Sequence, residues 1–207
     1  CLDRALREIR HDGADAQHKY LTKALRATQR LDELVGKIGE MEAADDPDVH
    51  VELERVDLRE AAGDAMDGMH ALASERHISL NWMQNGDVGA VAADRNHLNR
   101  ILTNLMCNAI KFSAPGGRVD VECLAANGSR RVRVTDYGPG ISIEDQNHLF
   151  ERFYRGAQAR RQGIPGTGLG LGLGLYISRT LARKMGADLG VATREGRGSS
   201  FTLSFPG

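Results

Sequence analysis

Residues 104–112 constrain the fold of this chain more than any other stretch. They fall in a predicted helix that begins after Asp94, a residue suited to an N-cap. Three- and four-residue spacing puts Asn104, Asn108 and Lys111 on one helix face. The other face is apolar, and we expect it to be buried: Leu98, Ile101, Leu102, Leu105, Ala109 and Ile110. One side of this helix should therefore cover a core while the other presents two amides and an ammonium group.

A carboxylate on a glycine turn follows downstream. Asp136 comes directly after a predicted strand and precedes Gly138 and Gly140. These glycines allow positive φ and a close approach of ligand to backbone. A carboxylate at a strand end can accept a hydrogen bond from an exocyclic amine such as that of adenine. An ordinary turn is the alternative explanation for the same residues.

Glycine then alternates with leucine in residues 166–175, directly ahead of a predicted amphipathic helix. Bare backbone N–H groups at a helix start, where the helix dipole is positive, form an anion site. The run lacks the Gly-Lys-Ser/Thr of a P-loop, and no early strand precedes it as in a dinucleotide fingerprint. A flexible linker is the alternative, but linkers favour serine over leucine. We expect a mobile ligand lid whose leucines pin it to the core.

These three segments together supply what a nucleoside triphosphate and its magnesium ion need. Mg²⁺ takes few protein oxygens besides those of the phosphates, and the amide oxygen of Asn108 suits it. The nearby ammonium of Lys111 would offset phosphate charge. A solvated polar helix face is the alternative for the two asparagines and the lysine.

The bulk composition excludes other function classes. The 27 basic and 28 acidic residues among 207 give a formal net charge of −1, so no global field favours nucleic acid or an anionic membrane. No apolar run reaches about eighteen residues, and no signal peptide is present. Three cysteines without metal-like spacing suit the cytosol. Because the chain starts at Cys1 inside a predicted helix, we expect a fragment whose parent could be membrane-anchored.

The pattern along the chain predicts two domains. Residues 1–43 are expected to form a helical hairpin, with a break at His11 to Asp15. Its second helix carries an apolar seam that one hairpin cannot bury, namely Leu21, Ala24, Thr28, Leu31, Val35 and Ile38. We expect a homodimeric four-helix bundle, with packing of the hairpin on its own domain as the alternative. A linker at 44–48 would lead into a domain at 49–207.

Strands and helices alternate in residues 49–207. Strands are expected at 49–56, 77–83 and 90–93, and hairpins at 119–135 and 188–205. Helices are expected at 57–73, 94–112, 142–153 and 174–185. The predicted class is α+β, a two-layer sandwich of a mixed sheet with helices on one face.

These segments resemble the catalytic, ATP-binding domain of sensor histidine kinases, which has the Bergerat or GHKL fold shared with DNA gyrase. The resemblance covers roughly residues 49–206. Residues 104–113 resemble the N box of that family and residues 136–141 its first glycine box. Residues 150–156 resemble the F box, and the segment from Gly166 resembles the second glycine box. Residues 198–202 resemble the closing strand of the family.

The resemblance implies roles at the nucleotide. Asn108 would ligate magnesium, and Asn104 and Lys111 would lie beside the phosphates. Phe112 would pack against the nucleotide, and Arg155 would reach the γ-phosphate. The adenine end would be held by Asp136, Gly138 and Gly140, with Thr202 acting through water.

Two features depart from the family pattern. The phosphate-binding role of the second glycine box could fall on residues 166–171 (Gly166, Thr167, Gly168, Leu169, Gly170 and Leu171) or on 170–175. Thr167 favours the first register and adjacency to Tyr176 favours the second. The acceptor histidine of the family sits in the first bundle helix. His11 here precedes Gly13 at a predicted turn and His18 is placed less well, so we expect the acceptor upstream of Cys1.

The resemblance implies an ATP-dependent protein histidine kinase core of a two-component system. Such an enzyme moves the γ-phosphoryl group of ATP to a histidine and then to an aspartate of a response regulator. Positioning and charge stabilisation would dominate catalysis. A nucleotide-sensing module without phosphotransfer is the first alternative. An ATPase-type clamp is the second, against which the helical hairpin and the F box argue.

Overall fold

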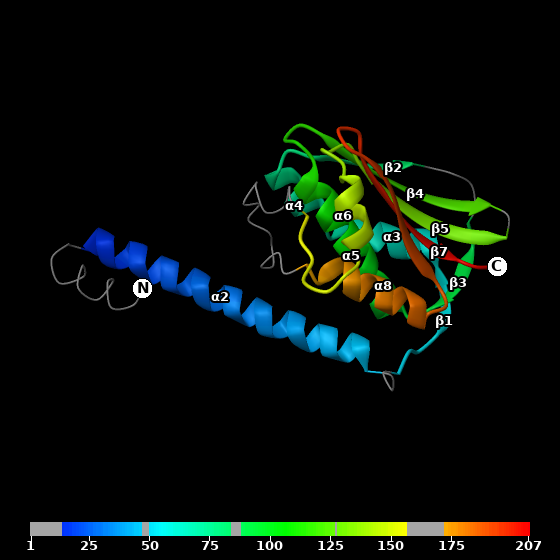
Figure 1. Cartoon of the computed structure of the whole chain (residues 1–207), viewed down its shortest axis with the longest axis horizontal. Coiled ribbons are helices and arrows are strands. Elements are labelled where there is room, and N and C mark those ends of the chain that lie inside the picture. Colours follow the sequence, from blue (N-terminus) through cyan, green and yellow to red (C-terminus); the bar gives the residue numbers. More distant parts are fainter. Residues whose placement is uncertain (1–13, 47–49, 84–87, 127, 157–171) are drawn as a thin grey trace.

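The computed structural model describes residues 14–46, 50–83, 88–126, 128–156 and 172–207. The first predicted helical piece, His11 and residues 166–171 lie outside these ranges. The described residues form a two-layer domain and one long helix that extends from it (Figure 1).

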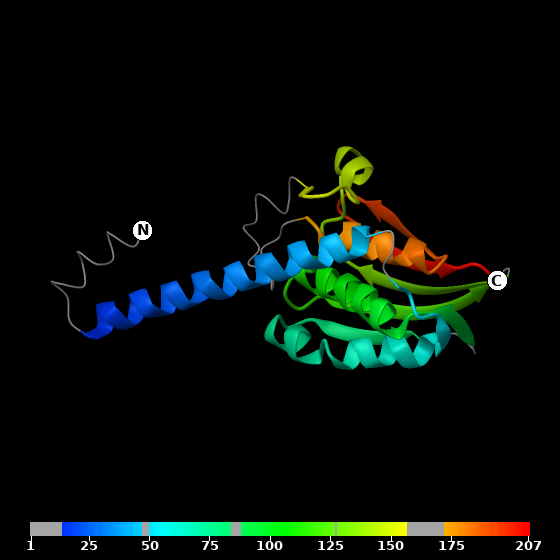
Figure 2. The same cartoon turned by 90° about the horizontal axis from the view of Figure 1, so that it is seen from below.

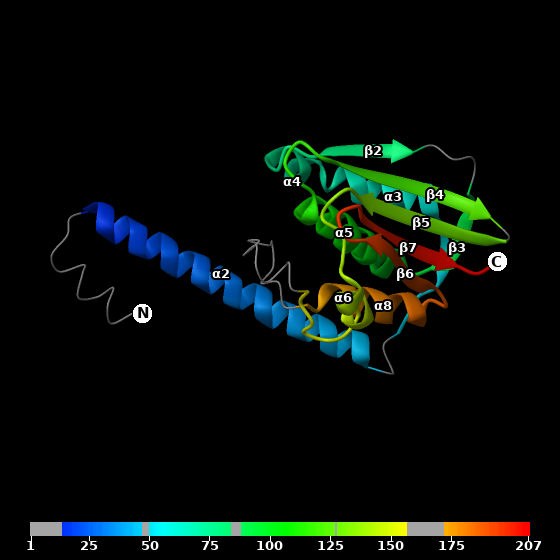
Figure 3. The same ribbon diagram turned by 45° about the horizontal axis from the view of Figure 1, so that its top comes forward.

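A mixed five-stranded sheet forms one layer. Its strand order is β2-β4-β5-β7-β6, in which β2 runs parallel to β4 and the other neighbours are antiparallel. Figure 3 shows the strands side by side with the helices behind them. The bounds are β2 Ser79–Met83, β4 Arg118–Ala126, β5 Ser129–Asp136, β6 Asp188–Arg194 and β7 Gly198–Phe205.

Three helices cover one face of this sheet: α3 (Leu58–Asp67), α5 (Arg95–Phe112) and α8 (Gly174–Lys184). The strands alternate buried and half-buried positions, as a sheet with one covered face should. The centre of the core consists of fully buried side chains from both layers: Leu58, Leu98, Ile101, Leu102, Leu105, Met106, Ile110, Leu181, Leu189 and Leu203. The predicted α+β class and the two-layer arrangement are confirmed.

Elements at the edge of the domain differ from the prediction. The strand predicted at 49–56 is the shorter β1 (Glu54–Asp57), which pairs antiparallel with β3 (Ala90–Ala93) in a separate two-stranded sheet. The predicted helix at 57–73 divides into α3 and α4 (His70–Glu75), with a turn at Gly68 and Met69. The helix α6 (Ile143–His148) is shorter than predicted.

The helix α2 (Ala14–Asp45) is 32 residues long and reaches well beyond the sheet (Figure 2). The seam residues Leu21, Leu31 and Val35 are exposed in the single chain, each by more than half of the side-chain surface. An amphipathic helix with such a bare apolar stripe is stable only when a partner covers the stripe. None of the helices in the described part of the chain is both long and apolar enough to cross a bilayer.

The C-terminal end of α2 docks on the domain. Ala44 is buried, and Glu40 forms an ion pair of 2.6 Å with Arg100 of α5. The carboxylate of Asp45 accepts a hydrogen bond from the Tyr176 hydroxyl and forms an ion pair of 3.0 Å with Arg152. The helix therefore continues two residues into the stretch that the sequence predicted as linker, because its last turn has tertiary partners.

Candidate nucleotide site

The helix α5 begins where the sequence predicted. The side chain of Asp94 accepts hydrogen bonds from the backbone N–H groups of His97, at 3.0 Å, and Glu52, at 3.2 Å. The predicted apolar face is buried and the residues Asn104, Asn108 and Lys111 on the other face are only partly buried. The cap and the apolar stripe thus orient the polar face of α5 away from the core.

Halfway along α5, Asn104 contacts the beginning of α8. Its Nδ2 donates a hydrogen bond of 2.9 Å to the Ser178 hydroxyl. A Cβ atom added to Gly174, the first residue of α8, would lie 2.5 Å from Oδ1 of Asn104. Because Gly174 has no Cβ atom, the helix can start this close to the amide without moving the Asn104 side chain. This contact places the N-terminus of α8 against the polar face of α5.

At the end of α5, Phe112 contacts the glycine turn after β5. A Cβ atom on Gly138 would lie 2.4 Å from the carbonyl oxygen of Phe112. The backbone N–H of Gly138 donates a hydrogen bond of 2.9 Å to Oδ1 of Asp136, whose side chain is buried. The turn is therefore held against the last residue of the helix, with the carboxylate inside it.

The β6–β7 turn braces the glycine turn from the other side. A Cβ atom on Gly140, whose φ is +70°, would lie 2.1 Å from the carbonyl oxygen of Arg194. The backbone N–H of Gly196 donates a hydrogen bond of 2.7 Å to the carbonyl of Pro139. Two backbone segments approach at van der Waals distance here, which explains why the position is a glycine.

The environment of Asp136 suits recognition of an amine. Burial raises the pKa of this carboxyl group, and hydrogen bonds from the backbone N–H groups of Gly138 and Ser199 oppose the rise. A carboxylate has about four lone-pair sites, so two backbone donors leave room for a third donor. An exocyclic amine of a base could fill that place.

These contacts bring the start of α8 and the Asp136 turn to the same helix. The start of α8 meets α5 at Asn104, and the glycine turn meets α5 at Phe112. Asn108 lies one turn from each, about 6 Å along the axis. The Asp136 turn and the described end of the glycine–leucine run, from Gly172 onward, therefore both lie against α5.

Thr202 is not part of this group. It pairs with Arg133, whereas Asp136 pairs with Ser199. Side chains alternate between the faces of a sheet, so Thr202 lies on the face opposite Asp136. The buried Ser199 is the residue of β7 next to the carboxylate. Counting β7 back from the buried Phe201 in steps of two would have found it.

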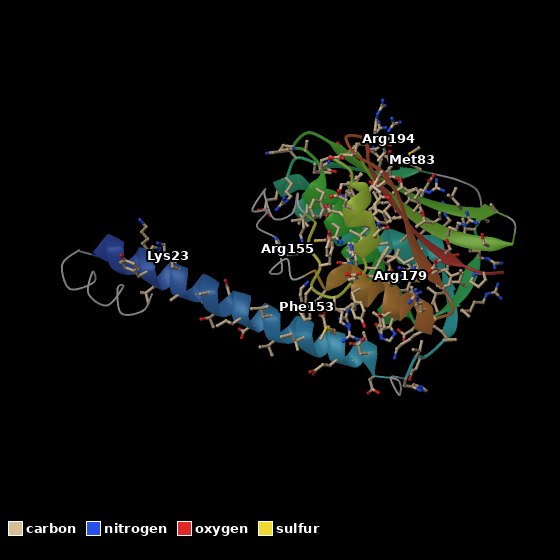
Figure 4. The ribbon with its side chains drawn as sticks, in the orientation of Figure 1. Lys23, Met83, Phe153, Arg155, Arg179 and Arg194 are labelled. Carbon is tan, nitrogen blue, oxygen red and sulfur yellow. The ribbon has the colours of Figure 1, made fainter. Side chains whose placement is uncertain are left out.

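Residues 166–171 lie outside the described residues, but the flanking glycines bear on the register. Gly172 has a φ of +71°, and a Cβ atom there would lie 2.0 Å from the carbonyl oxygen of Tyr154. Gly174 lies against Asn104. Both glycines belong to the register 170–175. Arg155 follows Tyr154 and extends on the side of the domain where α8 begins (Figure 4).

The start of α8 has the properties of an anion site. Leu173 at its N-cap has no side-chain acceptor for the first N–H groups. Those groups and the helix dipole favour a negatively charged ligand beside them. Phosphate oxygens adjacent to Asn104 would satisfy them.

A metal bound here would need ligands other than a protein cluster. Among the described residues no group of three or more His, Cys, Asp or Glu side chains could hold a metal ion. The side-chain amide oxygens that α5 offers at Asn104 and Asn108 suit Mg²⁺ only when phosphate oxygens complete its coordination. The site thus fits a metal that arrives with a polyphosphate.

The mixed sheet is covered on one face by helices, and the polar face of α5 meets both the Asp136 turn and the start of α8. This arrangement suits a nucleotide, and a comparison with known families agrees with it. Residues 93–207 match the family described as histidine kinase-, DNA gyrase B- and HSP90-like ATPases. The chain belongs to that family.

Curated relatives are sensor kinases by name. The chain is 30% identical over 196 residues to the sensor-like histidine kinase SenX3 of Mycolicibacterium smegmatis, covering 94% of this chain and 50% of SenX3. It is 33% identical over 208 residues to the sensor protein CutS of Streptomyces coelicolor, covering 99% and 49%. The chain thus spans about half the length of these relatives.

Solved structures of histidine kinases share the fold. Full-length ShkA in complex with AMPPNP superimposes with a TM-score of 0.78 at 27% identity, covering 92% of this chain and 38% of ShkA. The mycobacterial sensor histidine kinase MprB gives a TM-score of 0.59 at 28% identity, covering 75% and 97%. The Acinetobacter baumannii histidine kinase AdeS, at 18% identity, gives a TM-score of 0.72 over 99% of this chain and 92% of AdeS.

Proposed function

We propose that this chain is the ATP-binding core of a histidine protein kinase. The observation that carries the proposal is the convergence of α8 and the Asp136 turn on the polar face of α5, one turn on either side of Asn108. The match to kinase relatives and to the AMPPNP complex of ShkA supports ATP as the substrate.

The adenine end of the site is the Asp136 turn. The buried carboxylate accepts a hydrogen bond from the exocyclic amine, while its two backbone donors hold it in place. Gly138 lets the turn approach Phe112 and Gly140 lets it approach Arg194, and neither residue adds a side chain that would obstruct the base. Ser199, rather than Thr202, is the β7 residue that could assist through water, because it pairs with Asp136.

The phosphate end lies between α5 and α8. The N–H groups at the start of α8 bind phosphate oxygens, and Asn104 and Lys111 flank them. Mg²⁺, held by Asn108 together with phosphate oxygens, would neutralise part of their negative charge. Arg155 stabilises charge on the transferring γ-phosphoryl group. Phosphoryl transfer needs mainly such positioning and charge stabilisation.

The acceptor of the phosphoryl group is a histidine that we place upstream of Cys1. The exposed seam of α2 pairs with a second copy to form a four-helix bundle. A response-regulator receiver domain then takes the phosphoryl group on an aspartate. We place this part of the protein in the cytoplasm, where ATP is present.

Labelling with radioactive ATP and magnesium tests the proposal. The protein should be extended upstream through the preceding helix, so that the acceptor is present. We expect label in an acid-labile, base-stable phosphoamino acid. ATP binding without such label would instead support a nucleotide-sensing module, and absence of ATP binding would contradict both functions.

A further inference from the structure

Asp145 is a buried acid that has no part in the nucleotide contacts above. It lies in the first turn of α6, where its side chain and backbone are only 9% exposed. A buried carboxylate is costly unless hydrogen bonds satisfy it. The Tyr154 hydroxyl donates such a bond, at 2.6 Å, to Oδ1 of Asp145. The carboxylate thereby holds the chain that follows α6.

The other carboxylate oxygen faces the backbone at Gly156. A Cβ atom added there would lie 2.8 Å from Oδ2 of Asp145 and 3.2 Å from its Cγ atom. Any side chain at this position would displace the carboxylate. Asp145 therefore contacts the stretch from Tyr154 to Gly156 at both ends.

Tyr154 in turn lies against the residue that leads into α8. The Cβ position of Gly172 is 2.0 Å from the carbonyl oxygen of Tyr154 and 2.7 Å from its backbone nitrogen. Gly172 directly precedes Leu173, the buried N-cap of α8. A shift of the Tyr154 backbone would therefore move the start of α8.

The start of α8 is fixed on its other side by Asn104, through Gly174 and Ser178. A continuous series of contacts thus runs from Asp145 through Tyr154 and Gly172 to the N–H groups that face the phosphates. Interiors are packed closely enough to transmit a displacement of this kind.

We propose that Asp145 is a positioning residue for phosphate binding, which acts through Tyr154 and Gly172 on the N-terminus of α8. This inference rests on the proposed function, because it assumes that α8 faces the triphosphate. Asp145 itself touches no ligand in this scheme. Substitution of Asp145 should therefore weaken the binding of the phosphates and leave the binding of adenine unchanged.

The test compares a ligand with phosphates and one without. Affinities for Mg-ATP are measured by calorimetry and for adenosine by ligand-observed NMR titration. We expect Asp145→Ala and Tyr154→Phe to weaken Mg-ATP binding by about tenfold, the factor that the loss of one charge-assisted hydrogen bond would give. Adenosine affinity should stay unchanged in both variants.

Matched controls separate this role from a general loss of structure. Glu144→Gln removes a charge from the same helix turn at an exposed position and should leave both affinities unchanged. Asp136→Asn should weaken adenosine binding, which shows that adenosine reports the adenine end. The double variant Asp145→Ala/Tyr154→Phe should bind Mg-ATP no more weakly than either single variant, because both substitutions break the same series of contacts to α8.

Three outcomes would overturn the inference. Unchanged Mg-ATP affinity in Asp145→Ala would remove the acid from any role in binding. An equal loss of ATP and adenosine affinity in Tyr154→Phe would indicate damage to the whole domain. Independent, additive losses in the double variant would show that the two residues do not act through one another. Wild-type protein that binds neither ligand would contradict the proposed function instead.

Discussion

An alanine at position 172 would place its Cβ atom 2.0 Å from the carbonyl oxygen of Tyr154 in a backbone conformation with φ of +71°. The left-handed conformation costs a non-glycine residue about 1–2 kcal/mol. Overpacking against atoms that cannot rotate away costs about 1–3 kcal/mol more. We therefore expect Gly172→Ala to lower the free energy of unfolding by about 2–5 kcal/mol and to weaken Mg-ATP binding at least tenfold.

Two other glycines give a graded series. Gly63 lies within α3, where an added Cβ atom meets nothing within 4 Å. Gly63→Ala should raise the free energy of unfolding by about 0.5–1 kcal/mol, since alanine favours the helix, and should leave ATP binding intact. Gly174→Ala meets the side chain of Asn104, which can move at the expense of its bond to Ser178. Its stability should change little while its ATP affinity falls.

Urea unfolding and calorimetric titration of the three variants measure both quantities. Gly63→Ala should be the most stable variant, Gly174→Ala the next and Gly172→Ala the least stable. ATP affinity should be lost only in Gly174→Ala and Gly172→Ala. A Gly172→Ala protein as stable as the wild type, with normal ATP affinity, would refute the close contact between Tyr154 and the start of α8. Loss of ATP affinity in Gly63→Ala would show that the assay reports general perturbation.

Three further perturbations test other parts of the account. Asn108→Asp should weaken Mg-ATP binding severely, because a carboxylate beside the phosphates adds repulsion; unchanged affinity by calorimetry would remove Asn108 from the site. Burial raises the pKa of Asp136 in the folded protein above its ordinary value of 3.8, which the unfolded chain keeps. The folded state therefore binds the proton more tightly, and the protein loses stability as the pH rises from 3.8 through the raised pKa of the folded state. The melting temperature of Asp136→Asn should therefore rise relative to wild type from acid to neutral pH, and the opposite trend would contradict the burial effect. Val35→Asp puts a charge on the exposed seam of α2 and should convert a dimer to a monomer, as measured by light scattering. A wild-type protein that is monomeric at high concentration would contradict the proposal that the seam forms a dimer.

Local patterns predicted the elements that hold the site. The periodicity of residues 94–112, with Asp94 as cap, gave α5 and its buried face almost residue by residue. The turns at Gly128 and Gly196 lie where the hairpins β4–β5 and β6–β7 reverse. In each case the signal is carried by neighbours in the sequence, which is why the pattern alone suffices.

Tertiary contacts decided what the sequence could not predict. The parallel pairing of β2 with β4 and the separate pairing of β1 with β3 join distant segments. The extension of α2 to Asp45 depends on Arg152 and Tyr176, more than a hundred residues away. The burial of Asp145 follows from Tyr154 and Gly156 folding back over α6, and its side chain looks like an ordinary first-turn acid in the sequence.

The residues expected at the adenine end include one that a local pattern predicts correctly and one that strand pairing corrects. Asp136 was found because a glycine turn follows a strand, a local feature. The family resemblance implies Thr202 at this end, but Thr202 lies three residues from Ser199, and an odd number of residues along a strand reverses the sheet face. The register of β5 with β7 points to Ser199 instead.

A crystal structure with a non-hydrolysable ATP analogue and Mn²⁺ in place of Mg²⁺ would show whether the nucleotide lies between the Asp136 turn and the start of α8. We expect an adenine amine within hydrogen-bond distance of the Asp136 carboxylate, phosphates at the start of α8, and an anomalous manganese signal next to the Asn108 amide oxygen. A nucleotide bound on the Thr202 face of the sheet, or a manganese signal away from α5, would contradict it.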